Sequence, residues 1–117
     1  MPQPYAVIIE DDPKLSAIYQ ATLEHAGFDT ALDLNGDKYR ALLAAAEPAL
    51  VILDIHLPFA SGADILEEIR SQYPDTVIAI ATADLSKAKT LAGKADHILI
   101  KPVSVASLLK IAETAKG

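Results

Sequence analysis

The stretch "ALVILD", Ala49 to Asp54, sets five apolar residues in a row and then ends on a carboxylate. An uninterrupted apolar run of this length is typical of a strand buried on both faces, as in a parallel sheet covered by helices. A carboxylate at the end of such a strand is costly to desolvate unless a partner compensates its charge. The stretch therefore predicts a fold class and also marks a place where chemistry is expected.

Outward from this stretch, short apolar runs alternate with helical patterns along the whole chain. Strands are expected at 5–9, 28–33, 49–53, 76–81 and 97–100, and helices at 14–27, 38–47, 63–73, 86–93 and 105–117. The half-polar run at 28–33 indicates a strand at the edge of the sheet. Five β/α units in strict alternation predict an α/β fold, with a parallel sheet covered by helices on both faces.

Helical spacing predicts which side chains of three helices face the core. The expected inward positions are Leu15, Ile18, Thr22, Leu23 and Ala26; Tyr39, Leu42, Leu43 and Ala46; and Val105, Leu108, Leu109 and Ala112. Gly27 is expected to end the first helix, and Ser104 to cap the last one.

Length and charge limit the classes of protein to consider. The chain has 117 residues, a net charge of −6 and no cysteine. We therefore expect one domain over residues 1–117, with no disulfide framework and no direct contact with nucleic acid. The N-terminus lacks a signal-peptide pattern and the apolar runs are too short to span a bilayer, so we expect a cytoplasmic protein without membrane insertion.

Polar side chains stand directly after four of the expected strands. They are Glu10, Asp11 and Asp12 after the first strand, Asp54 after the third, Thr82 after the fourth and Lys101 after the fifth. The carboxyl ends of parallel strands meet at one edge of the sheet, where such folds bind their ligands. These side chains are therefore expected to gather at one site.

Taken singly, these residues have ordinary explanations. Asp12 before Pro13 is a good helix N-cap, and Thr82 could be a plain strand residue. Taken together they are chemically coherent, because crowded carboxylates stay ionised most easily around a divalent cation, and oxygen ligands suit Mg²⁺. A carboxylate beside the cation could attack phosphorus, while Lys101 and Thr82 supply a positive charge and a hydroxyl to phosphoryl oxygens.

The same motifs resemble the receiver domain of two-component response regulators over nearly the whole chain. The resemblance lies in the acidic pair after the first strand, "LDIHLPFASG" around Asp54, "TA" at Thr82 and "KP" at Lys101. It implies a three-layer, flavodoxin-like (βα)₅ fold with strand order 2-1-3-4-5. Because the sequence ends at the fifth helix, we expect a single receiver domain over residues 1–117 without an output domain, similar to stand-alone chemotaxis regulators; the alternative is one domain of a longer protein.

The resemblance also implies a role for each site residue. Asp54 would be the phosphoacceptor, and Asp11, Asp54, the backbone carbonyl of His56 and, through water, Glu10 would hold Mg²⁺, which Mn²⁺ could replace. Thr82 would be the switch hydroxyl, and Lys101 would pair with the phosphoryl group, its bond to Pro102 being cis. Asp12 remains the N-cap. His56 and Phe59 are expected to tune access to the site.

Two features depart from the family pattern. Ile98 stands three positions before Lys101, where the family usually carries Tyr or Phe. The segment from Thr82 to Lys101 is also a few residues shorter than usual, and the deletion falls in or near the fourth helix. We therefore expect an altered mode of output on the face formed by the fourth helix, the fifth strand and the fifth helix.

The implied function is that of a phosphoacceptor in a two-component system or phosphorelay. A sensor histidine kinase or a histidine phosphotransfer protein would donate the phosphoryl group, and an unknown downstream protein, or a second copy in a homodimer, would respond. The chain would not be an enzyme, apart from transferring the phosphoryl group to Asp54 and dephosphorylating itself. The main alternative is a pseudo-receiver that binds protein without phosphorylation.

Two enzyme classes fit the sequence less well. A haloacid-dehalogenase-type phosphohydrolase carries D-x-D after its first strand, whereas here the nucleophile candidate follows the third strand and has His56 two positions later. A nucleotide-binding enzyme would need a phosphate-binding glycine loop, and neither G-x-x-x-x-G-K-[ST] nor G-x-G-x-x-G is present.

Overall fold

The computed structural model describes residues 3–58 and 60–116, so Phe59 lies outside the described residues. Strand and helix alternate strictly along it. The strands are β1 (Tyr5–Ile9), β2 (Asp29–Asp33), β3 (Leu50–Asp54), β4 (Val77–Thr82) and β5 (His97–Ile100). The helices are α1 (Pro13–His25), α2 (Tyr39–Ala45), α3 (Gly62–Gln72), α4 (Leu85–Leu91) and α5 (Val105–Ala115).

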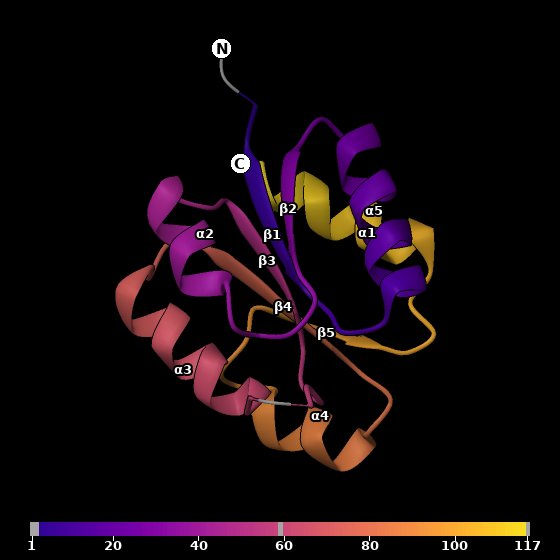
Figure 1. Ribbon diagram of the computed structural model, residues 1–117. Coiled ribbons are helices and arrows are strands. Elements are labelled where there is room, and N and C mark those ends of the chain that lie inside the picture. Colours follow the sequence, from indigo (N-terminus) through magenta and orange to yellow (C-terminus); the bar gives the residue numbers. More distant parts are fainter. Residues whose placement is uncertain (1–2, 59, 117) are drawn as a thin grey trace.

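The strands form one parallel sheet in the order β2-β1-β3-β4-β5, which confirms the predicted fold. Helices α1 and α5 cover one face of the sheet, and α2, α3 and α4 cover the other (Figure 1). The half-polar strand β2 lies at an edge, as its composition predicts. Because all strands run the same way, their carboxyl ends meet at a single edge, and we call this edge the carboxyl edge.

Two apolar clusters, one on each face of the sheet, make up the core. Alternate residues of a strand point to opposite faces, so Ile8 and Ile52 join α1 and α5, whereas Val7 and Val51 join α2, α3 and α4. Every residue of β3 is buried. The apolar run that predicted a doubly covered strand is therefore the centre of the core.

Three of the predicted inward positions are wrong. Ile18 is 49 % exposed and Val105 is 52 % exposed. The buried face of α1 instead contains Ser16, Tyr19, Thr22 and Leu23. Because two of these residues are polar, hydrophobicity alone does not predict this face. Val105 is the first residue of α5, whose buried positions come later, at Leu108, Ile111 and Ala112.

Ala46 is the third error, and it has a different cause. The helix α2 ends at Ala45, because the backbone of Ala46 is extended, with φ −160° and ψ 141°. Ala46 is exposed and belongs to the connection that leads into β3. The predicted helix was therefore too long at this end.

The ends of the helices place the loops that carry the site. Asp12, Ser61, Asp84 and Ser104 each cap a helix by accepting a backbone N–H bond. Gly27 follows the C-cap of α1 with φ 97°, a conformation that glycine adopts without strain. Among the described residues, no helix is both long and apolar enough to cross a bilayer.

Candidate functional site

Three carboxylates lie close together at the carboxyl edge. β1 and β3 are neighbours, with Ile9 beside Leu53, so the residues after β1 come next to the end of β3. One carboxylate oxygen from each of Glu10, Asp11 and Asp54 lies within 4.8 Å of the others. Glu10 and Asp54 are buried, and Asp11 is exposed. We call these three side chains the acidic cluster.

Lys101 is the cationic partner of the acidic cluster. Its Nζ atom lies 2.8 Å from Glu10 Oε1 and 3.5 Å from Asp54 Oδ1. Its backbone N–H donates to the carbonyl of Thr82 at 2.9 Å, which ties the residue to the end of β4. The bond from Lys101 to Pro102 is cis. One ammonium group facing three carboxylates leaves the site negatively charged.

The charge of the acidic cluster is reflected in its pKa values. Burial raises the pKa of Glu10 to about 7, although the hydrogen bond with Lys101 lowers it. Burial and a hydrogen bond with Asp11 raise the pKa of Asp54, and that same hydrogen bond lowers the pKa of Asp11. A divalent cation would relieve this repulsion, and a set of oxygen donors fits Mg²⁺.

Lys101 itself keeps its charge. Burial lowers its pKa, but the hydrogen bond with Glu10 and the charges of Glu10 and Asp54 outweigh burial, so the pKa is raised overall. The ammonium group is therefore a fixed positive charge beside Asp54. Such a charge can stabilise the oxygens of a phosphoryl group.

Asp54 is the last residue of β3, and its side chain is 3 % exposed. Its Oδ1 atom accepts the backbone N–H of His56 at 3.0 Å. His56 also forms an isolated bridge with Ser61, which closes the loop between β3 and α3. The carboxylate is thus oriented by its own loop while it faces both Asp11 and Lys101.

Thr82 ends β4, the strand beside β3, and is fully buried. Its Oγ1 atom accepts the backbone N–H of Asp84 at 3.0 Å. In the strand register Asp54 pairs with Ala81, the residue before Thr82. The structure thus brings Glu10, Asp11, Asp54, Thr82 and Lys101 to the same edge.

Asp12 takes no part in the acidic cluster. Its Oδ1 atom accepts the backbone N–H groups of Lys14 and Leu15, at 2.8 and 3.3 Å, and so caps α1. Its own backbone N–H donates to Glu10 Oε2 at 3.2 Å. The three consecutive acidic residues therefore have different roles. The first two belong to the acidic cluster, whereas the third caps α1 with its carboxylate and orients Glu10 with its backbone N–H.

Two carboxylates near the site were missed by the sequence reasoning. Asp84 caps α4, and its Oδ2 atom lies 3.6 Å from the Nε2 atom of His56. Asp33, at the end of β2, is fully buried and accepts four backbone N–H groups, those of Asn35, Gly36, Asp37 and Lys38. Its signal in the sequence was an Asp at a strand end followed by Leu-Asn-Gly.

Ile98 lies in β5, at the position where the family usually carries an aromatic residue. It pairs with Ile80 of β4 and is partly buried against the cluster that includes α2, α3 and α4. The helix α4 beside it has seven residues. Ile98 therefore packs as a core residue, and its effect on output remains a prediction.

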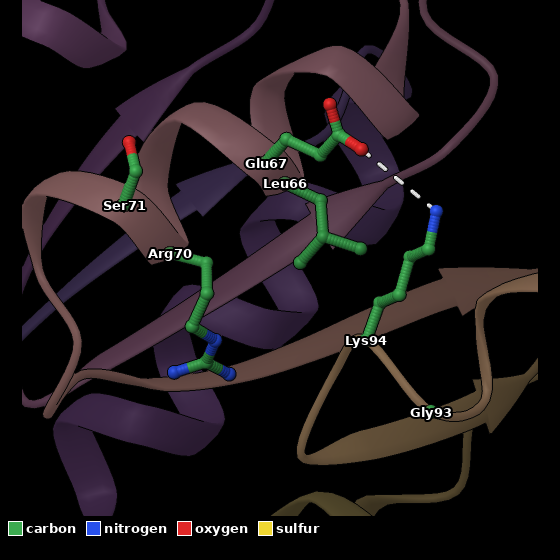
Figure 2. A pocket seen from close by; sticks show the side chains of 6 residues that line it. All are labelled: Leu66, Glu67, Arg70, Ser71, Gly93 and Lys94. Carbon is green, nitrogen blue, oxygen red and sulfur yellow. Dashed lines mark ion pairs between the residues drawn. The ribbon is translucent and has the colours of Figure 1, made fainter.

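A hollow of about 440 Å³ lies on the flank of the molecule between α3 and the segment after α4 (Figure 2). It is lined by Leu66, Glu67, Arg70, Ser71, Gly93 and Lys94. Lys94 is 3.8 Å from Glu67, and Arg70 is bonded to Asp96. Both cations of the hollow are thus already paired, and none of its lining residues belongs to the acidic cluster.

Residues 6–113 of this chain match the family of the response regulator receiver domain. The response regulator protein PilR of Pseudomonas aeruginosa is 33 % identical over 113 residues, which cover 94 % of this chain and 25 % of PilR. The chain thus spans about a quarter of the length of this curated relative.

Solved structures share the fold. A CheY-like response regulator receiver domain protein from Methanospirillum hungatei superposes with a TM-score of 0.88 at 24 % identity, over 98 % of this chain and 95 % of that one. The response regulator protein TrrA from Thermotoga maritima, solved in complex with Mg²⁺ and BeF, gives a TM-score of 0.85 at 24 % identity, over 96 % and 98 %. Since the family match covers nearly all of the sheet and helices described above, this chain belongs to the receiver domain family of two-component response regulators.

Proposed function

We propose that Asp54 accepts a phosphoryl group from the phosphohistidine of a sensor histidine kinase or a histidine phosphotransfer protein. The observation that carries this proposal is the position of its buried carboxylate, within 4.8 Å of Glu10 and Asp11 on one side and 3.5 Å from Lys101 Nζ on the other. A carboxylate is nucleophilic without a general base, so the arrangement needs only to orient it and to stabilise charge.

The phosphoryl transfer balances with groups at the site and on the donor. A carboxylate oxygen of Asp54 forms a bond to phosphorus while the bond from phosphorus to the donor's imidazole nitrogen breaks. The imidazole leaves and takes up a proton from solvent. Lys101 then pairs with a phosphoryl oxygen, and the Thr82 hydroxyl donates a hydrogen bond to another.

Four groups would hold Mg²⁺ or Mn²⁺: the side chains of Glu10, Asp11 and Asp54 and the backbone carbonyl of His56. The ion, when bound, neutralises charge on the phosphoryl oxygens. In self-dephosphorylation, water attacks phosphorus, the bond to Asp54 breaks and inorganic phosphate leaves. No separate substrate is turned over, so the chain acts as a switch and not as an enzyme in the usual sense.

The response is a change in protein binding. A phosphoryl group that draws Lys101 and Thr82 toward itself would alter the ends of β4 and β5, and so the face that α4, β5 and α5 form. A downstream protein, or a second copy of the chain, would read that change. The pseudo-receiver reading is less favoured, because every residue needed for phosphorylation stands at the carboxyl edge.

The test is intact mass after incubation with acetyl phosphate or phosphoramidate, with and without Mg²⁺. We expect a single phosphate adduct that requires Mg²⁺ and is absent from Asp54→Asn. The matched control is Asp75→Asn, which changes an exposed carboxylate far from the cluster in sequence and should keep the adduct. An adduct that persists in Asp54→Asn, or none in the unmodified protein, would overturn the assignment.

A further inference from the structure

Asp33 folds a turn that lies beside the acidic cluster. The residue ends β2 and is fully buried. Its carboxylate accepts four backbone N–H groups, those of residues 35–38, at distances between 2.8 and 3.3 Å. These donors compensate the burial of the carboxylate and fix the path of the chain around it. We call residues 34–38 the Asp33 turn.

The backbone of Asp33 is bonded directly to the acidic cluster. Asp33 pairs with Ile9 in the register of β1 and β2. Its carbonyl accepts the backbone N–H of Glu10, the first residue of the cluster, at 3.2 Å. One residue therefore contacts the site with its backbone and organises the neighbouring turn with its side chain.

The Asp33 turn packs against the loop that follows Asp54. The described residues of this loop are 55–58 and 60–61, and we call it the acceptor loop. Gly36 has a φ of 79°, and a Cβ atom added to it would lie 3.0 Å from Leu57 Cδ1 and 3.3 Å from Ala60 Cβ. Both distances are tighter than an ordinary van der Waals contact. Gly36 therefore leaves no room for a side chain between the turn and the acceptor loop.

Leu57 connects this contact to the site, because it directly follows His56 in the chain. The N–H of His56 donates to Asp54 Oδ1 at 3.0 Å, and the carbonyl of His56 is a proposed ligand of Mg²⁺. That carbonyl belongs to the peptide bond that joins His56 to Leu57, so a displacement of Leu57 would move it. The packing of Gly36 on Leu57 thus bears on both groups of His56 that the site uses.

We propose that Asp33 is a positioning residue for phosphoryl transfer, because its carboxylate holds the turn in which Gly36 supports Leu57 and the His56 carbonyl. This inference rests on the proposed function of Asp54. A turn that served only to start α2 would explain the bond to the N–H of Lys38, the N-cap of that helix. It would not explain the close packing of Gly36 on the acceptor loop.

Gly36→Ala tests the contact, and Gly27→Ala is the matched control. Both glycines have a positive φ, of 79° and 97°, so alanine at either position should lower the resistance of the protein to urea. A Cβ atom at Gly27 would have Lys116 Nζ as its nearest neighbour, at an ordinary 3.5 Å. Only Gly36→Ala should therefore displace the acceptor loop.

The rate of adduct formation with phosphoramidate, followed as a function of Mg²⁺ concentration, separates positioning from stability. We call the Mg²⁺ concentration that gives half of the maximal rate the Mg²⁺ requirement. It should rise about tenfold in Gly36→Ala, as expected when the group that orients a metal ligand is disturbed, and should not change in Gly27→Ala. In metal-free protein labelled with ¹⁵N, the amide signal of His56 should shift in Gly36→Ala and stay in place in Gly27→Ala.

Further variants follow the route from Asp33 to Leu57. Asp33→Asn replaces one acceptor oxygen with an N–H₂ group and should also raise the Mg²⁺ requirement. Its control is Thr76→Val, which removes a buried hydroxyl that donates to the carbonyl of Pro48 at 2.8 Å and should leave the Mg²⁺ requirement unchanged. In protein that already carries Leu57→Ala, adding Gly36→Ala should raise the Mg²⁺ requirement by about twofold or less, because the contact has been removed.

Equal Mg²⁺ requirements in Gly36→Ala and Gly27→Ala, or a His56 amide signal that does not move, would overturn this inference and leave the proposed function intact. So would an unchanged Mg²⁺ requirement in Asp33→Asn, or an effect of Gly36→Ala that is equally large when Leu57 is already alanine. If the unmodified protein forms no Mg²⁺-dependent adduct, the proposed function fails, and this inference fails with it.

Discussion

The two ends of the sheet each hold a cluster of charged groups, and the two clusters are built on opposite principles. At the edge where the strands begin, which we call the amino edge, Arg70 donates hydrogen bonds to Asp96 and to the carbonyls of Pro74 and Thr76. Asp96 in turn accepts the backbone N–H of Ile78 at 2.8 Å. Positive and negative charges are equal there, and each partner has several bonds.

The carboxyl edge is unbalanced by comparison. Its three carboxylates share one ammonium group, and burial raises the pKa of Glu10 and Asp54. At the amino edge burial also raises the pKa of Asp96, but the N–H of Ile78 and the guanidinium of Arg70 outweigh it and lower the pKa overall. A cluster whose charges are balanced stabilises the fold, whereas a cluster with an excess of negative charge favours the binding of a cation.

The largest expected effect comes from the loop that carries the unbalanced cluster. A Cβ atom at Gly62 would lie 2.5 Å from the Cα atom and 2.6 Å from the carbonyl oxygen of Ile55. Gly62→Ala should therefore lower the free energy of unfolding by about 3 kcal/mol, as overpacking against backbone does. Urea denaturation measures this. Gly93→Ala is the control, because a Cβ there meets nothing within 4 Å, and a similar loss in both variants would contradict the prediction.

The balanced cluster should matter for stability and not for chemistry. Arg70→Ala should lower the free energy of unfolding by about 2 kcal/mol, because it removes the donor of two carbonyls and leaves Asp96 with only the backbone N–H of Ile78. The phosphate adduct on Asp54 should still form. Lys94→Ala, which removes only the exposed pair with Glu67 at 3.8 Å, should cost about 0.5 kcal/mol or less. A lost adduct in Arg70→Ala would show that the two edges are not independent.

The unbalanced cluster should make stability depend on pH. Burial raises the pKa of Glu10 to about 7 in the folded protein, whereas in the unfolded chain, where the side chain is exposed to water, the pKa is the ordinary 4.5. The folded state therefore binds the extra proton, and its stability falls as the pH rises from about 4.5 to about 7. Without Mg²⁺ we expect this loss to be on the order of 2 kcal/mol.

Urea denaturation in EDTA, from about pH 5 to about pH 8, tests this dependence. Glu10→Gln is the matched comparison, because an amide cannot titrate, and its stability should lack this fall with pH. If the unmodified protein and Glu10→Gln lose stability in parallel across the range, the titrating group lies elsewhere.

The smallest expected effect comes from the exposed carboxylate of the acidic cluster. Asp11→Asn removes one of the crowded charges but also the hydrogen bond with Asp54 that lowers the pKa of Asp11, so without Mg²⁺ the free energy of unfolding should change by no more than about 0.5 kcal/mol. The stabilisation that Mg²⁺ gives to the unmodified protein should be largely lost, as thermal unfolding with and without Mg²⁺ would measure. Asp75→Asn should keep that stabilisation, and an Asp11→Asn protein that Mg²⁺ still stabilises fully would argue against Asp11 as a ligand.

Much of the fold follows from local patterns in the sequence. The doubly buried run at β3 and the alternation of strand and helix predicted a parallel sheet with covered faces, because one strand run and one helical run are each short-range signals. The same topology predicted that Glu10, Asp11, Asp54, Thr82 and Lys101 share an edge. The errors at Ile18 and Val105 arose where a buried face carries polar residues or where the helix had just begun.

The sequence by itself determined which residue types stand at the ends of the strands, and hence the family and the kind of chemistry to expect. Only the tertiary structure decided how these groups are paired: Lys101 pairs with Glu10, Asp84 lies beside His56, and, within residues 3–58 and 60–116, the Tyr19 hydroxyl is buried without a hydrogen-bond partner. The physical reason is that pattern and propensity act between near neighbours in the chain. Charge balance and hydrogen bonding at the site depend on distances between segments that only the folded chain brings together.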